Sequence, residues 1–256
     1  MELWHQTALG FFIYVVVVAD LLPRLAGRRR RRAIAGSAIG AALVIAGSRI
    51  APSHWLNVWV LPPVVLLIGY YASGLLFTEP MPRAEHALAR LDAALRIDAI
   101  ARRVPRALAE LLEFSYAGVY PLMVIAETIA LSYGVQPDRF WTVLMWTDFL
   151  CFAMLPWIRT RTPREVIPIE PWRSSWRALN LRIVGASSIG VNTFPSGHAA
   201  VPLAAALLLV GAPWPWVLLM FTATAAISAG AVFGRYHYAA DAIAGWAVAA
   251  IVYVVL

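Results

Sequence analysis

Two histidines lie in patterns that could support a chemical reaction. His198 ends the stretch Pro195-Ser196-Gly197-His198, directly before a long apolar run, and His237 lies in the stretch GRYHYAAD. Because His237 and Asp241 are one helical turn apart, their side chains would share a helix face, and the carboxylate can accept a hydrogen bond from one ring nitrogen. The other ring nitrogen of His237 is then free to act as a nucleophile.

The residues around His198 predict an anion site at the start of a helix. Pro195 suits the first turn of a helix, because its missing amide hydrogen would have no partner there. Ser196, Gly197 and His198 then present backbone amides at the positive end of that helix, and glycine lets phosphate oxygens approach closely. This interpretation explains why polar residues interrupt so apolar a chain.

Several arginines are candidates for binding the same anion. The stretch PWIRTRTPRE places Arg159, Arg161 and Arg164 just after a predicted helix, and Arg235 lies two residues before His237. Guanidinium groups fork onto phosphate oxygens and stay charged at any working pH, which suits the neutralisation of charge during phosphoryl transfer. The alternative is that these arginines only anchor the chain at a membrane surface.

Composition indicates a membrane protein. Of the 256 residues, 61% are hydrophobic and 14% are charged, and several windows of about 20 residues are apolar enough to cross a bilayer. The net charge of +7 comes from arginine alone, and in a membrane protein such residues mark cytoplasmic loops more often than a nucleic-acid partner. The single cysteine, Cys151, excludes an internal disulfide.

We therefore expect an all-α fold, a polytopic transmembrane helical bundle of about eight spans. Three regions follow: N-terminal transmembrane helices over 1–77, an amphipathic interfacial loop over 78–113, and a catalytic transmembrane core over 114–256. The predicted spans cover residues 7–23, 33–50, 55–77, 114–133, 138–157, 196–212, 213–233 and 239–256.

The stretch AEHALARLDAALR in the second region has a helical period, with apolar residues at Ala84, Leu88, Leu91 and Leu95. Pro105 separates it from a second short helix that runs to about residue 114. The amphipathic helix could lie along the membrane surface or dock against other helices.

Arginine counts predict the orientation. With eight spans, nearly all arginines fall on one side, including the run Arg28 to Arg32, and only Arg49 and Arg139 fall on the other. Positive loops stay in the cytoplasm, so both termini are expected outside and the loop with His198 inside, in a bacterial plasma membrane.

Three acidic residues, Asp20, Glu127 and Asp148, fall inside predicted spans. An acidic group is unfavourable there unless it meets a partner or a watery cavity. Structural pairing with Tyr, Trp or Arg is the favoured interpretation, and a proton or ion path is the other. Tyr116 and Tyr120 could line a lipid cavity or simply pack.

The chain resembles the type 2 phosphatidic acid phosphatase superfamily, whose signature is a basic block ending in Arg-Pro, then PSGH, then a serine-arginine block ending in His and Asp. PSGH is intact, and so are His237 and Asp241, followed by AIAG. Ala231 replaces the usual third-block arginine, and the first block has Pro163-Arg164 in reversed order, with Trp157 at the place of the usual lysine. With these departures, the chain resembles the branch of the superfamily that includes inositol phosphorylceramide synthases.

The resemblance implies roles for these residues. His237 would attack phosphorus and form a phosphohistidine, Asp241 would orient it, and His198 would protonate the leaving oxygen. Phosphate oxygens would be held by arginines, a serine and a glycine amide, with no metal or cofactor needed: Arg161, Arg164, Arg235, Ser196 and Gly197, with Arg159 as a further candidate.

The function expected from the resemblance is hydrolysis of a lipid phosphate monoester or diphosphate, with a phospholipid or polyprenyl phosphate as substrate. One alternative is a phosphotransferase that moves the phospho-head group to a lipid hydroxyl. Another is a non-enzymatic transporter or scaffold on the same bundle, which His237→Ala should leave active. Vanadium haloperoxidases share the signature blocks but are soluble. The oligomeric state stays open.

Overall fold

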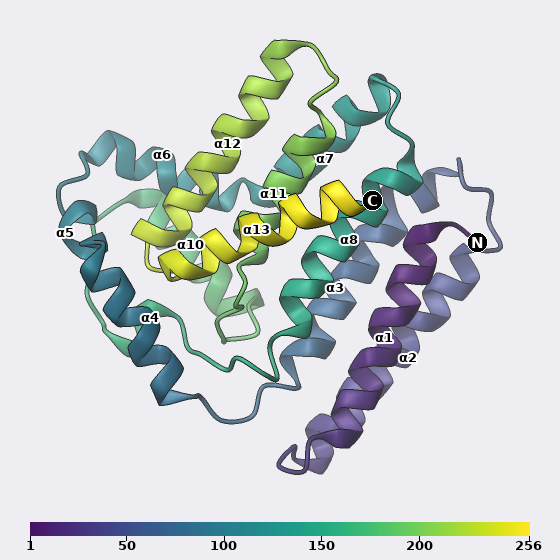
Figure 1. Cartoon of the computed structure of the whole chain (residues 1–256), viewed down its shortest axis with the longest axis horizontal. Helices are drawn as coiled ribbons and strands as arrows, with labels where there is room; N and C mark the ends of the chain where they lie inside the picture. Colours follow the sequence, from purple (N-terminus) through teal and green to yellow (C-terminus); the bar gives the residue numbers. More distant parts are fainter.

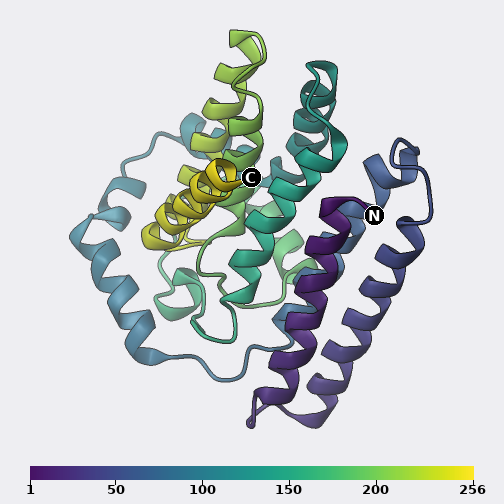
Figure 2. The same ribbon diagram turned by 45° about the vertical axis from the view of Figure 1, so that its right-hand side comes forward.

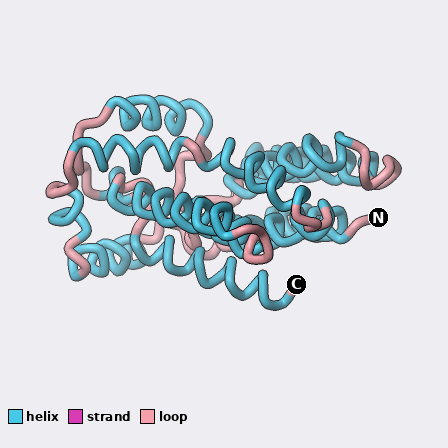
Figure 3. Tube along the Cα trace, turned by 90° about the horizontal axis from the view of Figure 1, so that it is seen from above, coloured by secondary structure: helices cyan, strands magenta, loops and turns pink.

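Helices make up 73% of the chain, and no sheet forms (Figure 1). The computed structural model describes residues 1–256. Loops are short between most helices, as a view from above makes clear (Figure 3). The helices are α1 (Leu3–Leu21), α2 (Gly27–Gly47), a π-helical turn (Leu56–Val60) that continues into α3 (Leu61–Gly74), α4 (Pro82–Ala94), α5 (Ile97–Ala101), α6 (Arg106–Ala117), α7 (Val119–Ser132), α8 (Pro137–Ala153), α9 (Pro163–Val166), α10 (Ser175–Ser187), α11 (Gly197–Leu208), α12 (Trp214–Phe233) and α13 (Ala239–Val255).

Three helices are long and apolar enough to cross a membrane: α1, the continuous helix Leu56–Gly74, and α12. A fourth span is possible if α6 and α7, which bend by 66° at their junction, are counted as one. The membrane character expected from composition is therefore supported. A helix lies in each of the eight predicted ranges, but eight spans are not confirmed. Apolar α11, for example, has 12 residues and extends for about 18 Å, short of a bilayer core of about 30 Å.

The main core lies between the N-terminal helices and the later ones. Residues of α1, α3, α8 and α11 form one buried apolar cluster. Phe11 of α1 stacks face to face on Phe149 of α8, with ring centroids 4.1 Å apart, and Cys151 is buried nearby as a free thiol. Helix α8 thus joins the α1–α3 group to the helices that carry His198 and His237 (Figures 1 and 2).

The amphipathic helix α4 docks against the rest of the molecule through its acidic residues. Glu85 and Asp92 are buried, whereas Leu91 and Leu95 are exposed. Helix α4 therefore lies along the outside of the bundle (Figure 1), with these two carboxylates toward the protein and with Arg83, His86 and Arg90 exposed. The structure shows α4 docked against other helices, and its outer face carries both leucines and basic side chains. Pro105 precedes α6 as the break predicted there.

Helices α11 and α13 pack along each other, and a glycine permits their close approach. A Cβ atom on Gly245 of α13 would lie 2.5 Å from the carbonyl oxygen of Ser196 and 3.3 Å from the nitrogen of Ala200. Side chains larger than a hydrogen atom do not fit at this contact. The two helices that position the candidate catalytic residues are thus held in direct backbone contact.

Candidate functional site

The two histidines come from different helix starts. His198 is the second residue of α11, while His237 lies in the connection between α12 and α13, two residues before α13 begins. Pro195 lies before the helix instead of in its first turn, because Ser196 has extended backbone angles and forms the N-cap. The prediction for Pro195 is therefore wrong by one or two positions, although the helix starts where expected.

The rings of His198 and His237 face one another across a short gap. Their centroids are 5.6 Å apart, with an angle of 44° between the planes. Behind His237, its Nδ1 atom lies 3.4 Å from Oδ2 of Asp241. Both His237 and Asp241 are buried. The pairing of imidazole and carboxylate expected from their spacing is thus present, and it leaves Nε2 of His237 for other contacts.

Two hydrogen bonds hold the carboxylate of Asp241 in place. Its Oδ2 atom accepts from the backbone nitrogen of Tyr238 at 2.8 Å and from Nδ2 of Asn192 at 2.9 Å. The same Asn192 amide also donates to Oγ1 of Thr160 at 3.0 Å. Asn192 is fully buried, and it escaped the sequence analysis. The available signal was an Asn-Thr pair four residues before Ser196 in an apolar chain.

Backbone contacts join the PSGH stretch to α13. The Ser196 nitrogen donates to the backbone oxygen of Asp241 at 2.9 Å. Together with the Gly245 contact, this bond fixes the start of α11 relative to the start of α13. The geometry of the two histidines therefore depends on main-chain packing as well as on side chains.

Several buried polar atoms around the histidines have no hydrogen-bond partner. They include Oγ of Ser196, Oδ1 of Asn192 and Oδ1 of Asp241. Nδ1 of His237 makes no hydrogen bond either, but it faces Oδ2 of Asp241 at 3.4 Å. The backbone amides of Gly197 and His198 also have no acceptor in the protein. Most buried polar groups in proteins are paired, so this concentration of unpaired ones at one place indicates a site that can bind a polar ligand.

Aromatic rings surround His198. Its imidazole stacks on Tyr116 at 5.0 Å and meets the ring of Tyr120 edge-on at 6.2 Å. Tyr116 in turn stacks on Tyr236 at 4.1 Å. Tyr116 of α6 and Tyr120 of α7 therefore pack around His198, which stays partly accessible.

Arg164 is the arginine nearest to this arrangement of rings. Its guanidinium carbon lies 5.2 Å from the centroid of Tyr236, and the side chain forms no ion pair. It is half-buried. A positive group therefore lies next to the same tyrosine that stacks on Tyr116, within the group of side chains around His198.

The other candidate arginines make hydrogen bonds or ion pairs within the protein: Arg159, Arg161 and Arg235. Arg161 forms a two-pronged ion pair with Glu85, with nitrogen–oxygen distances of 2.9 and 2.8 Å. Arg159 donates to the carbonyl oxygens of Glu79 and Pro156 at 2.8 and 2.6 Å.

Arg235 has a left-handed backbone, with φ of 63°. Its side chain pairs with Asp98 and donates to the carbonyl oxygens of Pro163 and Ile167. It ties the segment that carries Arg164 to the connection before His237.

A buried carboxylate that the sequence analysis missed supports the tyrosines. Glu113 of α6 is fully buried and accepts hydrogen bonds from Trp172, Arg177, Asn180 and the hydroxyl of Tyr236. Burial raises the pKa of Tyr236, so its hydroxyl stays protonated and donates. No sequence pattern signals Glu113, because its partners come from distant parts of the chain: Trp172 before α10, Arg177 and Asn180 in α10, and Tyr236 after α12.

The acidic residues expected inside spans have different surroundings. Glu127 accepts a hydrogen bond from Nε1 of Trp141 at 2.8 Å, as the structural interpretation predicts. Asp20 is exposed. Asp148 of α8 lies against the start of α11, because a Cβ atom on Gly197 would be 2.4 Å from its Oδ1.

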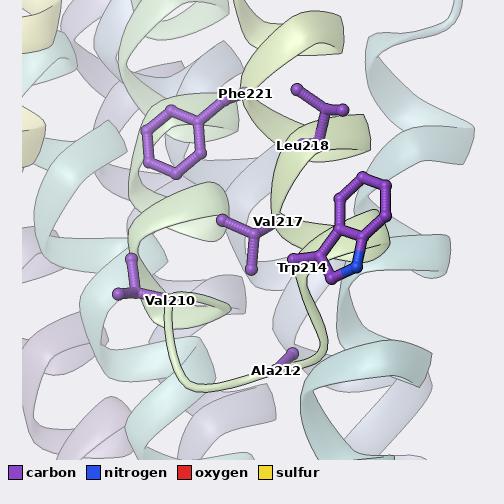
Figure 4. A pocket seen from close by; sticks show the side chains of 6 residues that line it. All are labelled: Val210, Ala212, Trp214, Val217, Leu218 and Phe221. Atoms are coloured by element: carbon purple, nitrogen blue, oxygen red, sulfur yellow. The ribbon is translucent and has the colours of Figure 1, made fainter.

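The apolar pocket of the structure lies away from the histidines. It encloses about 450 Å³ at the turn between α11 and α12, and Figure 4 shows its lining of Val210, Ala212, Trp214, Val217, Leu218 and Phe221. Because His198 is at the other end of α11, this pocket does not contribute to the candidate site.

Comparison with models of protein families, with curated proteins and with solved structures gives no match to this chain. An assignment of function therefore rests on the residues and their geometry.

Proposed function

We propose that this chain is a membrane lipid phosphatase that works through a phosphohistidine, as members of the type 2 phosphatidic acid phosphatase superfamily do. The observation that supports it most is the pair of imidazoles with centroids 5.6 Å apart and a carboxylate 3.4 Å behind one of them. A phosphorus atom between the two rings would be within reach of a nucleophile on one side and an acid on the other.

In the first step, Nε2 of His237 attacks phosphorus and the bond from phosphorus to the lipid oxygen breaks. The proton on Nδ1 stays directed at Asp241, which stabilises the positive imidazole. His198 gives its proton to the leaving lipid oxygen, and the phosphate dianion beside it favours the protonated imidazole.

In the second step, a water molecule attacks the phosphohistidine. His198 takes a proton from this water, and the nitrogen–phosphorus bond breaks. Inorganic phosphate is released, and neutral His237 and protonated His198 are regenerated. Atoms and charge balance over the two steps, with lipid alcohol and phosphate as products.

The phosphate oxygens have several donors nearby. Arg164 supplies a positive group free of carboxylate partners, and Oγ of Ser196 with the amides of Gly197 and His198 supplies unpaired hydrogen-bond donors. Donors placed in advance around developing negative charge are the largest contribution to most phosphoryl transfers. Arg159, Arg161 and Arg235 support the site by holding its backbone.

We place this enzyme in a bacterial plasma membrane, with about eight membrane-embedded helices that include the short α11. The arginine count puts the loop with His198 on the cytoplasmic face. Cysteines introduced at Arg30 and at Ser174 should then share the same lack of labelling by a membrane-impermeant thiol reagent in intact cells. Labelling of both would reverse the orientation.

The decisive experiment measures phosphate release by the purified protein from phosphatidic acid, polyprenyl diphosphate and phosphatidylglycerol phosphate. His237→Ala and His198→Ala should each abolish release from the accepted lipid, whereas the control His54→Ala, at an exposed position, should keep it. Full turnover by His237→Ala would end the proposal and favour a transporter or scaffold.

The same assay separates hydrolysis from transfer. With a labelled phospholipid and added diacylglycerol or ceramide, hydrolysis gives labelled inorganic phosphate regardless of acceptor, while transfer gives a labelled lipid only when the acceptor is present. Trapping of a labelled, acid-labile phosphohistidine on wild-type protein, absent from His237→Ala, would support both routes equally.

A further inference from the structure

A second cavity, separate from the histidines, is lined by positive charge. It is a pocket open to the surface with a volume of about 450 Å³, and three arginines from distant parts of the sequence line it: Arg24, Arg83 and Arg159. Arg24 lies in the turn between α1 and α2, Arg83 is the second residue of α4, and Arg159 follows α8. We infer that this pocket binds a phosphate group that is distinct from the substrate phosphate.

The charges in this pocket are not neutralised by the protein. None of the three arginines forms an ion pair, since the pairs in the structure involve other residues. The one carboxylate in the lining is Glu79, so three positive groups and one negative group leave a surplus of two positive charges. An unneutralised cluster of this kind attracts an anion of two charges.

One arginine is held in a fixed orientation for this purpose. Arg159 donates from Nε to the oxygen of Glu79 and from Nη1 to the oxygen of Pro156, and both acceptors are neutral carbonyls. Its own backbone oxygen accepts from the nitrogen of Met81 at 2.7 Å. The guanidinium is therefore oriented without losing its charge, and Nη2, which has no acceptor in the protein, is free to donate to a phosphate oxygen.

The pocket and the histidine site lie on opposite sides of one short segment. Arg159 faces the pocket, while its neighbour Thr160 bonds to Asn192, which bonds to Asp241. Successive residues of an extended segment point to opposite sides. The two anion sites therefore share a backbone segment but no side chain.

The position of the pocket indicates which phosphate it meets. Arg24 is three residues beyond the end of α1, and Thr78 in the lining is four residues beyond the end of α3. Figures 1 and 2 place both connections at the same end of the molecule, and Arg29 of α2 donates to the backbone oxygen of Gly74 there. This end, where two spans leave the membrane, is the depth of phospholipid head groups.

The chemistry recognised is a phosphate mono- or diester, and the head group of an anionic phospholipid is the source that this depth favours. The test uses the purified full chain in neutral maltoside micelles. Binding of phosphatidylglycerol, of phosphatidylcholine and of inorganic phosphate is followed by native mass spectrometry and by the shift in thermal midpoint.

The main variant is Arg24→Gln/Arg83→Gln. Its matched control is Arg28→Gln/Arg31→Gln, which removes the same charge from exposed residues of α2 outside the pocket. We expect wild-type and control proteins to retain phosphatidylglycerol over phosphatidylcholine, and the pocket variant to lose affinity by about tenfold or more. Arg24→Gln alone, in an exposed turn, covers the case in which the double variant does not fold.

Each outcome bears on the inference. Equal loss of binding in the pocket and control variants would reduce the effect to diffuse surface charge and overturn it, and so would unchanged binding in both. If inorganic phosphate binds the wild type as well as the lipid does, and the pocket variant loses both, the site stands with a soluble source. Phosphate release at the histidines should persist in the pocket variant, so this test can fail while the proposed function stands.

Discussion

Substitution of Gly245 by alanine tests whether close packing of α11 and α13 sets the geometry of the two histidines. The added Cβ atom would lie 2.5 Å from the backbone oxygen of Ser196, about 1 Å closer than non-bonded atoms normally pack. Because that neighbour is backbone, no side chain can rotate away. The helices must separate by a comparable distance, and this changes the spacing of His198 from Asp241 and His237.

The magnitude follows from two opposing effects. Overpacking at a tight contact costs about 1–3 kcal/mol, while alanine in place of glycine in a helix favours folding by about 1 kcal/mol. The net loss of stability should be about 1 kcal/mol, which lowers the thermal midpoint by roughly 2–4 °C in a protein of this size. A displacement of about 1 Å at a catalytic centre can slow turnover by roughly a hundredfold. Activity should therefore fall much more than stability.

The assay compares thermal midpoint and phosphate release for Gly245→Ala with two matched glycine-to-alanine changes. Gly10 of α1 and Gly185 of α10 also lie in helices, and a Cβ atom there meets nothing within 4 Å. Both control variants should keep wild-type turnover and unchanged or slightly higher midpoints. If Gly245→Ala turns over lipid at the wild-type rate with a normal midpoint, backbone contact does not set the site and the reasoning is wrong.

Three further predictions concern the supports of the site. Arg161→Gln and Glu85→Gln should each lower the thermal midpoint by several degrees and leave turnover measurable, and the double variant should be no less stable than either single variant. A loss of turnover without a change in midpoint would instead indicate that Arg161 binds the substrate. Burial raises the pKa of Asp92 from its usual 3.8 to about 6, so its contribution to stability is fully present below the unfolded pKa and is lost as the pH rises from about 4 to 6. The midpoint of Asp92→Asn should lack this dependence, as scans from about pH 3.5 to about 7.5 would show. Asn192→Ala removes a hydrogen-bond donor from the carboxylate of Asp241, and kcat should fall by about ten- to a hundredfold with little change in KM. If KM rises by that factor while kcat is unchanged, Asn192 acts in substrate binding.

The sequence predicted the helix starts beside the two histidines because the patterns that mark these starts are local. PSGH opens a helix, and His237 precedes the next helix with Asp241 in its first turn. His198 lies within a few residues of the start of α11, and His237 and Asp241 lie within a few residues of the start of α13. Helix periodicity also placed a helix in every predicted range. The number of spans is less well predicted, because α11 is shorter than the apolar run that contains it.

Glu113 and Asn192 were not predictable for a different reason. Both act by accepting or donating several hydrogen bonds to residues far away in the sequence, such as Tyr236 for the first and Asp241 for the second. A lone polar residue in an apolar helix signals a partner, but not which one. Three-dimensional packing supplies that information.

Spacing in the sequence did not predict which of the arginines approaches the rings around His198, because that depends on the path of the backbone. Thr160 forms an isolated antiparallel bridge to Asn192, and in such a bridge neighbouring side chains along the chain point in opposite directions. Arg159 and Arg161 fall on the side of α4, and Thr160 falls on the side of Asp241. Only after the chain turns into α9 does Arg164 approach Tyr236. The position of Arg164 beside Tyr236 therefore depends on where this segment ends and α9 begins.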